Sequence, residues 1–392
     1  MNTSSLRAAL AAMAFAPLFV ACGGGGGADA GSGGGIGGTG GMRVSLTDAP
    51  ACGFDQVNIT VDRVRVHADS AAADGDTGWH EIVVSPPRRI DLLNLTNGVL
   101  DELGEVALPA GRYSQLRLVL ATNGGATPFA NSVLPTGRAE VALTTPSAQQ
   151  SGLKLKTAID VPAGQVADVV LDFDACRSVV RRGNSGAYNL KPVITVTPVL
   201  SAAGLRVVGY VAPSIAAGAS VSVQFQGTPV KATVPDPLSG RFTLYPVPEG
   251  TYDLVVTSTT RRTTVVTGVP VRPDAPTALN DAATPLLPPP ATFRSITGVV
   301  SPRTANVRVA QALTGGPTVE VTWAPVDADT GAFATAVPVG ATLRGAYGPT
   351  VALIEDAATG GRYTVQASDG TSTRETPVDA NAPISPLVFT LP

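Results

Sequence analysis

The chain has 392 residues, too many for one β-sandwich, so two or three domains are expected. Hydrophobic residues make up 44% of it and charged residues 15%, and its 33 prolines and 43 glycines favour short strands joined by turns over helices. The formal net charge of −3 gives no electrostatic reason to bind nucleic acid, which needs clustered Lys and Arg, so we predict no nucleic-acid partner.

The first 21 residues have the features of a cleaved secretory signal. Arg7 precedes an apolar run, residues 8–21, that is short for a membrane span and ends in small side chains. Nothing after Ala21 reaches the run of about 18 apolar residues that a membrane helix needs, so we expect the rest to be soluble. We therefore predict a signal peptide over residues 1–21.

The end of this segment, Phe19-Val20-Ala21-Cys22, resembles a bacterial lipobox, with Phe19 in place of the usual leucine. The resemblance implies that Cys22 becomes an acylated N-terminus, and two or three acyl chains together anchor a protein stably. Gly23 stands where an aspartate would retain lipoproteins at the inner membrane, which favours the outer membrane by analogy with enteric bacteria. We predict Cys22 as the lipid-attachment site, with membrane contact through its acyl chains.

Residues 22–41 link this cysteine to the first folded domain. Glycine occupies 13 of the 19 positions from Gly23 to Gly41, a composition typical of a flexible coil. No strand precedes the segment and no Gly-Lys-Ser/Thr ends it, so a phosphate-binding loop is not indicated. We predict a tether.

The two remaining cysteines, Cys52 and Cys176, form an even pair in a chain predicted to be exported, where disulfides persist. A bond between them would close a loop of more than 100 residues and stabilise the domain by about 4–5 kcal/mol in the chain-entropy model. We predict this disulfide; the alternative is two buried free thiols.

Residues 42–200 are predicted to form a first domain of strands with alternating side chains. Gln115 and Arg117 face away from the leucines of their strand. Within 57–66 the apolar phase slips by one residue, which predicts a bulge near Asp62. The pattern favours a β-sandwich or an open Greek-key barrel, and for the whole chain we predict an all-β, multidomain, antiparallel fold.

After residue 200 one smaller pattern occurs twice, over 204–282 and over 293–392. The corresponding motifs are Val208-Gly209-Tyr210-Val211 and Ile296-Thr297-Gly298-Val299-Val300, Gly240-Arg241-Phe242 and Gly331-Ala332-Phe333, and Val247-Pro248-Glu249-Gly250 and Val337-Pro338-Val339-Gly340. The second copy carries an insertion before Tyr363. We predict two copies of one β-sandwich, separated by a Pro-rich, semi-rigid linker over 283–292.

The first domain resembles a family of uncharacterised bacterial lipoproteins, domain of unknown function 4382. The resemblance implies an exported, anchored β domain and no known activity. Its motifs are Val44-Ser45-Leu46-Thr47-Asp48-Ala49-Pro50, Gly78-Trp79, Ile90-Asp91-Leu92-Leu93, Pro109-Ala110-Gly111-Arg112-Tyr113, Thr145-Pro146-Ser147, Gly152-Leu153-Lys154, Leu171-Asp172-Phe173-Asp174 and Leu190-Lys191-Pro192.

The two repeats resemble carboxypeptidase-regulatory-type domains. The resemblance implies seven-stranded, transthyretin-like sandwiches of the kind that serve as accessory modules of exported proteins. The matching core in the first copy is Gly240-x-Phe242-x-Leu244-x-x-Val247-Pro248-x-Gly250-x-Tyr252-x-Leu254-x-Val256.

Carboxylates offer the best candidates for chemistry. Asp172 and Asp174 are two apart on one predicted strand, so they project from one face, and Asp48 joins them if the two strands are neighbours. Two like charges this close need a cation, an arginine or backbone donors to offset them. We therefore consider a calcium site at Asp48, Asp172 and Asp174; the alternative is an edge that is solvated or paired with Arg177, Arg181 or Arg182.

Two acidic loops, 74–78 and 327–331, look like calcium loops. Both lack the glutamate at loop position 12, and turns use the same residues, so we predict turns.

Other chemistry is weakly indicated. His67 and His80 are interpreted as surface histidines, with half of a metal site as the alternative. Ser151-x-x-Lys154 matches the nucleophile motif of penicillin-recognising enzymes. The alternating pattern of residues 153–156 instead predicts a strand, on which Ser151 and Lys154 would face opposite sides. A platform that stacks on a carbohydrate could be formed by Trp79, Tyr113 and Tyr188. The alternative is that these aromatic side chains are buried in the strands, which is the commoner case.

We predict an envelope-anchored lipoprotein with a binding or structural role, no catalysis and no required cofactor. Its partners would be the membrane and another envelope protein or a polysaccharide. One alternative is a calcium-dependent binding protein or hydrolase that uses the carboxylates of the first domain. A second alternative is an accessory partner of an outer-membrane assembly.

Overall fold

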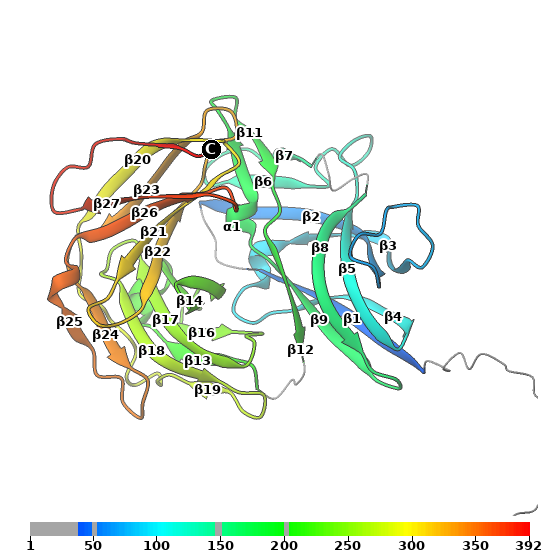
Figure 1. Cartoon of the computed structure of the whole chain (residues 1–392), viewed down its shortest axis with the longest axis horizontal. Helices are drawn as coiled ribbons and strands as arrows, with labels where there is room; N and C mark the ends of the chain where they lie inside the picture. Colours follow the sequence, from blue (N-terminus) through cyan, green and yellow to red (C-terminus); the bar gives the residue numbers. More distant parts are fainter. Residues whose placement is uncertain (1–37, 49–52, 146–150, 200–203) are drawn as a thin grey trace, which may run out of the picture. The chain divides into compact units, whose positions relative to one another are not determined.

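The computed structural model describes residues 38–48, 53–145, 151–199 and 204–392. Nearly all their regular structure is strand, and the helices are short turns: η1 Leu92–Leu95, α1 Ala175–Ser178, α2 Pro213–Ala216 and η2 Ala357–Thr359. In this part of the chain no helix has the length and apolar character to cross a membrane. The predicted all-β, multidomain fold class is confirmed (Figure 1).

The first domain contains strands β1 to β12. They are β1 Thr39–Asp48, β2 Phe54–His67, β3 His80–Asp91, β4 Asp101–Pro109, β5 Gly111–Leu120, β6 Ser132–Pro135, β7 Val141–Thr144, β8 Leu153–Val161, β9 Val166–Phe173, β10 Val179–Arg182, β11 Ala187–Leu190 and β12 Ile194–Val199. One sheet has the order β12-β9-β1-β4, and the larger sheet has the order β10-β11-β7-β6-β2-β5-β8, with β3 paired to β2 (Figure 1).

One shared core is built by the inward faces of these sheets. The apolar side chains Val57, Ile59 and Val61 of β2 are fully buried, and after a register shift between Val61 and Arg63 the next two, Val64 and Val66, are buried as well. The bulge predicted near Asp62 is therefore confirmed. An extra residue at this point restores the apolar side chains to the core face.

Strand β1 begins at Thr39, inside the predicted tether. Gly40 pairs with Leu108 of β4, and a Cβ atom added at Gly40 would lie 2.3 Å from the backbone oxygen of Pro162. Only glycine fits that approach, so part of the glycine-rich sequence is needed for packing.

The two repeats have the same strand order. Their strands are β13 Val207–Tyr210, β14 Ala219–Phe225, β15 Thr228–Thr233, β16 Arg241–Leu244, β17 Gly250–Ser258, β18 Thr264–Val271 and β19 Thr277–Ala278 in the first, and β20 Phe293–Ser301, β21 Asn306–Ala312, β22 Thr318–Ala324, β23 Ala332–Pro338, β26 Arg362–Ser368, β27 Thr373–Asp379 and β28 Leu387–Thr390 in the second. In the first repeat, β16-β13-β19 accompanies β15-β14-β17-β18; in the second, β23-β20-β28 accompanies β22-β21-β26-β27.

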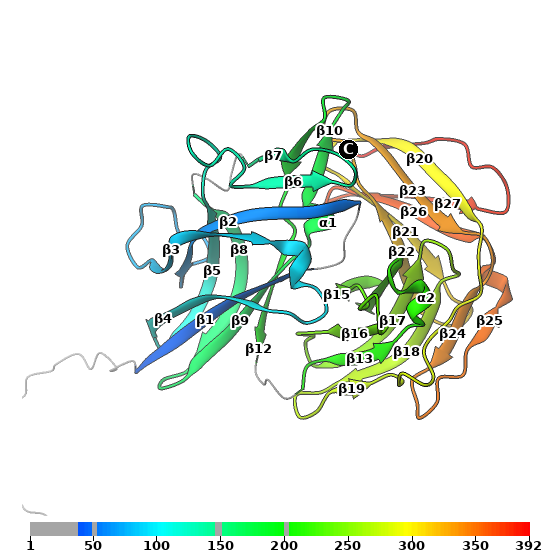
Figure 2. The same ribbon diagram turned by 180° about the vertical axis from the view of Figure 1, so that it is seen from behind.

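The insertion before Tyr363 forms β24 Thr342–Ala346 and β25 Ile354–Asp356. β24 pairs in parallel with β18 of the first repeat, so the insertion extends the sheet of the other domain (Figure 2). Val255 and Val265 of the first repeat also belong to the apolar core of the second. The two repeats therefore share both a sheet and part of a core.

The segment 283–292 is packed along the first repeat and does not act as a spacer. Leu286 is 6% exposed and forms a bridge with Val211, and Pro290 forms a bridge with Arg261. The prolines favour extended backbone, which is the conformation that these bridges need, so a Pro-rich composition suits a segment packed along the domain.

In each domain a tyrosine hydroxyl donates a hydrogen bond to the backbone oxygen of a proline. Tyr113 donates to the Pro109 oxygen at 3.0 Å, and Tyr252 donates to the Pro248 oxygen at 2.8 Å. Tyr363 donates to the Pro338 oxygen at 2.7 Å across the insertion. The second repeat therefore keeps the tyrosine–proline hydrogen bond of the first repeat in spite of the insertion.

Candidate functional site

The three predicted calcium ligands lie at the ends of β1 and β9. The parallel register pairs Asp48 with Phe173 and not with Asp172. Because successive residues of a strand face opposite sides, Asp48 and Asp172 lie on opposite faces of the sheet. Asp48 is 1% exposed, and its Oδ1 accepts a hydrogen bond of 2.9 Å from the amide of Ala175.

Asp172 meets a cation from another domain. Its Oδ1 lies 2.6 Å from Nζ of Lys231, which belongs to β15 of the first repeat. The side chains are 12% and 2% exposed, so the pair is almost removed from water. Each charge then depends on the other, because an isolated buried charge is strongly unfavourable.

Asp174 caps α1 and contacts Arg177. Its Oδ1 accepts a hydrogen bond of 2.9 Å from the Arg177 amide, and its Oδ2 lies 3.3 Å from Nε of the same residue. Burial raises the pKa of the Asp174 carboxyl, and the contacts with Arg177 oppose that rise.

Glu320 of β22 brings the second repeat into the same group. It forms an ion pair with Arg177, and its Oε2 lies 3.8 Å from Nη1 of Arg308. Burial raises the pKa of Glu320 against the effect of both guanidinium groups. Gln224 of the first repeat exchanges two hydrogen bonds of 2.8 Å with the Glu320 backbone, so all three domains meet here.

The geometry gives the predicted calcium site no support. In the described part of the chain, no three His, Cys, Asp or Glu side chains are grouped so as to hold a metal ion. Asp172 and Asp174 contact Lys231 and Arg177, whereas Asp48 lies on the other face and binds a backbone amide. The alternative interpretation, an arginine-paired edge, describes Asp174 correctly.

A cavity of about 700 Å³ adjoins this charged group. Besides Asp172, Asp174, Arg177, Lys231 and Glu320, hydroxyl side chains line it, among them Ser220, Ser222 and Thr257. These serines alternate with Val221 and Val223, whose side chains are buried in the core, so the strand period itself directs hydroxyls towards the cavity.

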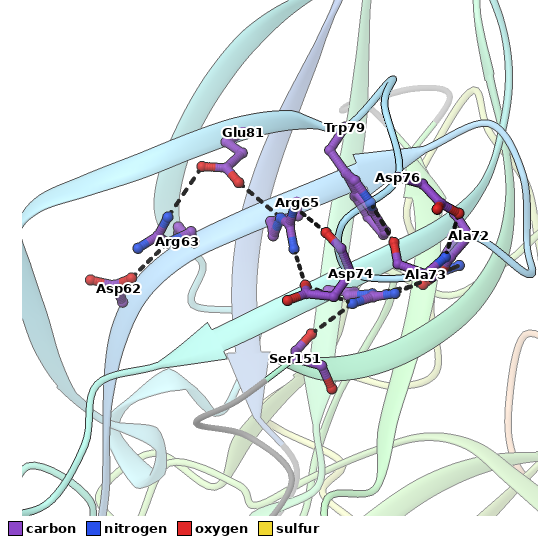
Figure 3. A network of polar contacts seen from close by, with 12 residues as sticks. Asp62, Arg63, Arg65, Ala72, Ala73, Asp74, Asp76, Trp79, Glu81 and Ser151 are labelled. Carbon is purple, nitrogen blue, oxygen red and sulfur yellow. Dashed lines mark hydrogen bonds and ion pairs between the residues drawn. The ribbon is translucent and has the colours of Figure 1, made fainter.

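Trp79 is held by arginines. The guanidinium carbons of Arg65 and Arg117 lie 4.5 and 4.4 Å from its ring centre. Its Nε1 donates to the Ala73 oxygen at 2.9 Å (Figure 3). Stacked cations occupy the ring that a sugar would need. The carbohydrate platform considered for Trp79 is therefore not available there.

Arg117 is 0% exposed, which the sequence did not indicate. Its guanidinium donates to the oxygens of Ala72 at 2.7 Å, Gln115 at 2.7 Å and Asp74 at 3.1 Å. Arg117 does face away from the leucines of β5, as predicted, but the loop between β2 and β3 covers this face. Desolvation lowers its pKa, and Asp74 opposes that effect.

The other residues considered for chemistry take part in contacts that stabilise the fold. The ring of His67 lies 5.0 Å from that of Trp79, and its Nδ1 accepts a hydrogen bond of 2.9 Å from the Asp69 amide. Lys154 lies on β8, so the strand predicted there is confirmed, and Ser151 does not begin a helix. Asp327 accepts hydrogen bonds from the amides of the next turn, as expected for a turn.

Of the three predicted cysteine sites, the structure describes Cys176. Cys22 and Cys52 lie outside the described residues. Cys176 is 5% exposed in α1. The lipid attachment and the Cys52–Cys176 disulfide stay predictions.

Comparison with known families agrees with the resemblance of the first domain. Residues 39–192 match the model of the family described as "Domain of unknown function (DUF4382)". The matched span contains Asp48, Asp172 and Asp174, whereas Lys231 and Glu320 lie beyond it. The matched first domain thus supplies Asp172 on β9 and Asp174 at the start of α1, and the repeats supply Lys231 and Glu320 beside them. The carboxypeptidase-regulatory resemblance of the repeats stays a prediction.

No curated protein matches the chain. Among solved structures, a type II cohesin–X-dockerin complex from Acetivibrio cellulolyticus is 29% identical, with a TM-score of 0.18, over 21% of this chain and 56% of that one. The major pilin SpaA of Corynebacterium diphtheriae is 11% identical, with a TM-score of 0.17, over 90% of this chain and 99% of the pilin. The chain thus spans little more than half of the cohesin–dockerin chain, and at these TM-scores neither likeness carries an argument.

Proposed function

We propose that this chain is a lipid-anchored envelope protein with a non-catalytic, structural role, whose three β domains are held together as one body. The observation that carries the proposal is the buried pair of Asp172 and Lys231. The carboxylate that the sequence favours for chemistry is used in a contact between domains, and Arg177 with Glu320 repeats that arrangement nearby.

The junction between the repeats supports the same role. β24 of the second repeat continues the sheet of the first, and Val255 and Val265 of the first repeat belong to the core of the second. Domains joined only by flexible linkers move independently, whereas a shared sheet and core favour a fixed spacing. An element of fixed spacing suits a structural component that projects from a membrane anchor.

The anchor is tested with Cys22→Ser in the native host. We expect wild-type protein to take up a palmitate analogue and to sediment with membranes, and Cys22→Ser to lose the label and enter the soluble fraction. Ser32→Ala, in the predicted tether, serves as the control that keeps both properties. A Cys22→Ser protein that is exported and still sediments with membranes contradicts the anchor.

The structural role is tested by crosslinking in cells followed by mass spectrometry. A structural component should give reproducible crosslinks to neighbouring envelope proteins or polysaccharide, and one dominant protein partner would indicate an accessory subunit of an assembly. Turnover of a substrate by the purified protein would contradict the non-catalytic role.

A further inference from the structure

A second cavity, of about 640 Å³, lies between the DUF4382 domain and the second repeat. Lys191, just after β11, forms one side, and Arg303 and Trp323 of the second repeat form the other. A volume of this size is within the range of sites that hold small molecules. Arg177, Val193 and Trp323 also line the cavity described above, so the two spaces adjoin.

Positive charge predominates in this cavity. Four basic side chains line it, Arg177, Lys191, Arg303 and Arg308, and there is no Asp or Glu among the described residues of its lining. Arg177 and Arg308 share the buried Glu320 behind the wall.

Lys191 and Arg303 have no such neutralisation. Within the described residues, neither has a carboxylate at ion-pair distance; Nζ of Lys191 instead donates to the Thr304 oxygen at 2.7 Å. Although Lys191 is exposed, partial desolvation by neighbouring atoms lowers its pKa. Two cations without carboxylate partners favour an anion as the occupant, because charge-assisted hydrogen bonds to an oxyanion are stronger than hydrogen bonds between neutral groups.

Uncharged groups of the lining indicate what a ligand needs besides its negative charge. Trp323 contributes an aromatic ring. The guanidinium carbon of Arg177 lies 5.7 Å from its centre, farther than either of the two guanidinium carbons that stack on Trp79. Asn189 lines the cavity, and its buried Oδ1 has no hydrogen-bond partner in the described part of the chain, which leaves an acceptor for a donor from outside. Hydroxyl donors, an apolar ring face and an anionic group occur together in acidic sugars.

We propose that this cavity binds a saccharide that carries a carboxylate, with Lys191 and Arg303 on the carboxylate and Trp323 against the sugar ring. The proposal goes beyond the structural role, because it assigns a ligand to the junction that holds the domains together.

Isothermal titration calorimetry of the purified full-length protein tests this proposal. The probe is the α-1,4-linked trisaccharide of galacturonic acid, and its neutral control is the corresponding trisaccharide of galactose. We expect the acidic trisaccharide to bind at least about tenfold more tightly than the neutral one, because hydrogen bonds to charged groups have this magnitude. Binding should weaken when salt rises from about 20 to 300 mM, because salt screens charges.

Variants locate the site. Arg303→Gln should weaken binding by about tenfold, and Trp323→Leu should weaken it whereas Trp323→Phe retains it. Arg112→Gln, at an exposed arginine of the first domain, is the matched control and should leave binding unchanged. Because Arg303 is exposed and has no ion-pair partner in the described residues, its variant should unfold at the temperature of the wild type.

The titrations would overturn the proposal if the acidic trisaccharide did not bind at millimolar concentration, if the neutral trisaccharide bound equally well, or if Arg303→Gln left binding unchanged. Competition with inorganic phosphate separates a sugar site from a bare anion site. If phosphate displaces the trisaccharide at an equal concentration, the sugar ring contributes nothing and the proposal fails.

Discussion

Arg117 and Lys231 are both cations with almost no exposure, but different parts of the molecule hold them. Arg117 is enclosed within its own domain, by backbone and side-chain oxygens and by the ring of Trp79. Lys231 is neutralised by Asp172 from another domain. The first arrangement fixes a loop to its sheet, and the second fixes one domain to another.

The difference predicts how far the loss of one contact would destabilise each region. Arg117 has several neutral acceptors and a half-exposed carboxylate, so loss of one contact leaves others. The Lys231 ammonium has one carboxylate at ion-pair distance among the described residues. Damage at Asp172 should therefore spread to the junction of the domains, whereas damage around Arg117 should stay local.

Asp172→Asn should have the largest effect. It leaves the Lys231 ammonium buried without a counter-charge, and removal of one partner of such a pair costs about 3–5 kcal/mol of unfolding free energy. Urea denaturation measures the loss. The double variant Asp172→Asn/Lys231→Met should recover most of it, because no unpaired charge then stays buried. If the double variant is as unstable as the single one, the pair does not act as a unit.

Trp79→Leu should have an intermediate and local effect. It removes two cation–π contacts, with an expected loss of about 1–2 kcal/mol. Hydrogen exchange should accelerate at the amides of residues 69–78 and not in β14 or β22. Exchange that also accelerates at the domain junction would contradict the distinction between the two regions. Trp79→Phe should lose less unfolding free energy than Trp79→Leu, since its ring still faces the guanidinium groups.

Glu320→Gln should have the smallest effect, visible in the pH dependence. Burial raises the folded-state pKa of Glu320 above its unfolded value, so its contribution to stability is fully present below the unfolded pKa, about 4.3, and is lost as pH rises through the folded pKa. The variant lacks this titration. Its stability relative to wild type should therefore increase from pH 4 to pH 7 in urea denaturation, and a relative decrease would contradict the assigned direction.

Local patterns predicted much of the fold. The slip in apolar phase at Asp62 was sufficient to predict the bulge, because only one face of β2 enters the core. The recurrence of Gly240-Arg241-Phe242 as Gly331-Ala332-Phe333 was sufficient to pair the repeats, and their strand orders agree. The candidate site was less accessible: Asp172 and Asp174 were singled out, but Lys231 and Glu320 were not.

The sequence by itself determined which side of each strand a residue faces, since side-chain alternation is a local property of extended backbone. It therefore placed Arg117 away from the leucines. The same rule predicted Asp174 on one strand with Asp172, but β9 ends at Phe173 and Asp174 caps α1. Only the tertiary structure decided what covers those faces: a loop over Arg117, Lys231 against Asp172, and β24 beside β18. These contacts join segments far apart in the chain, and their free energy depends on burial that no single segment creates.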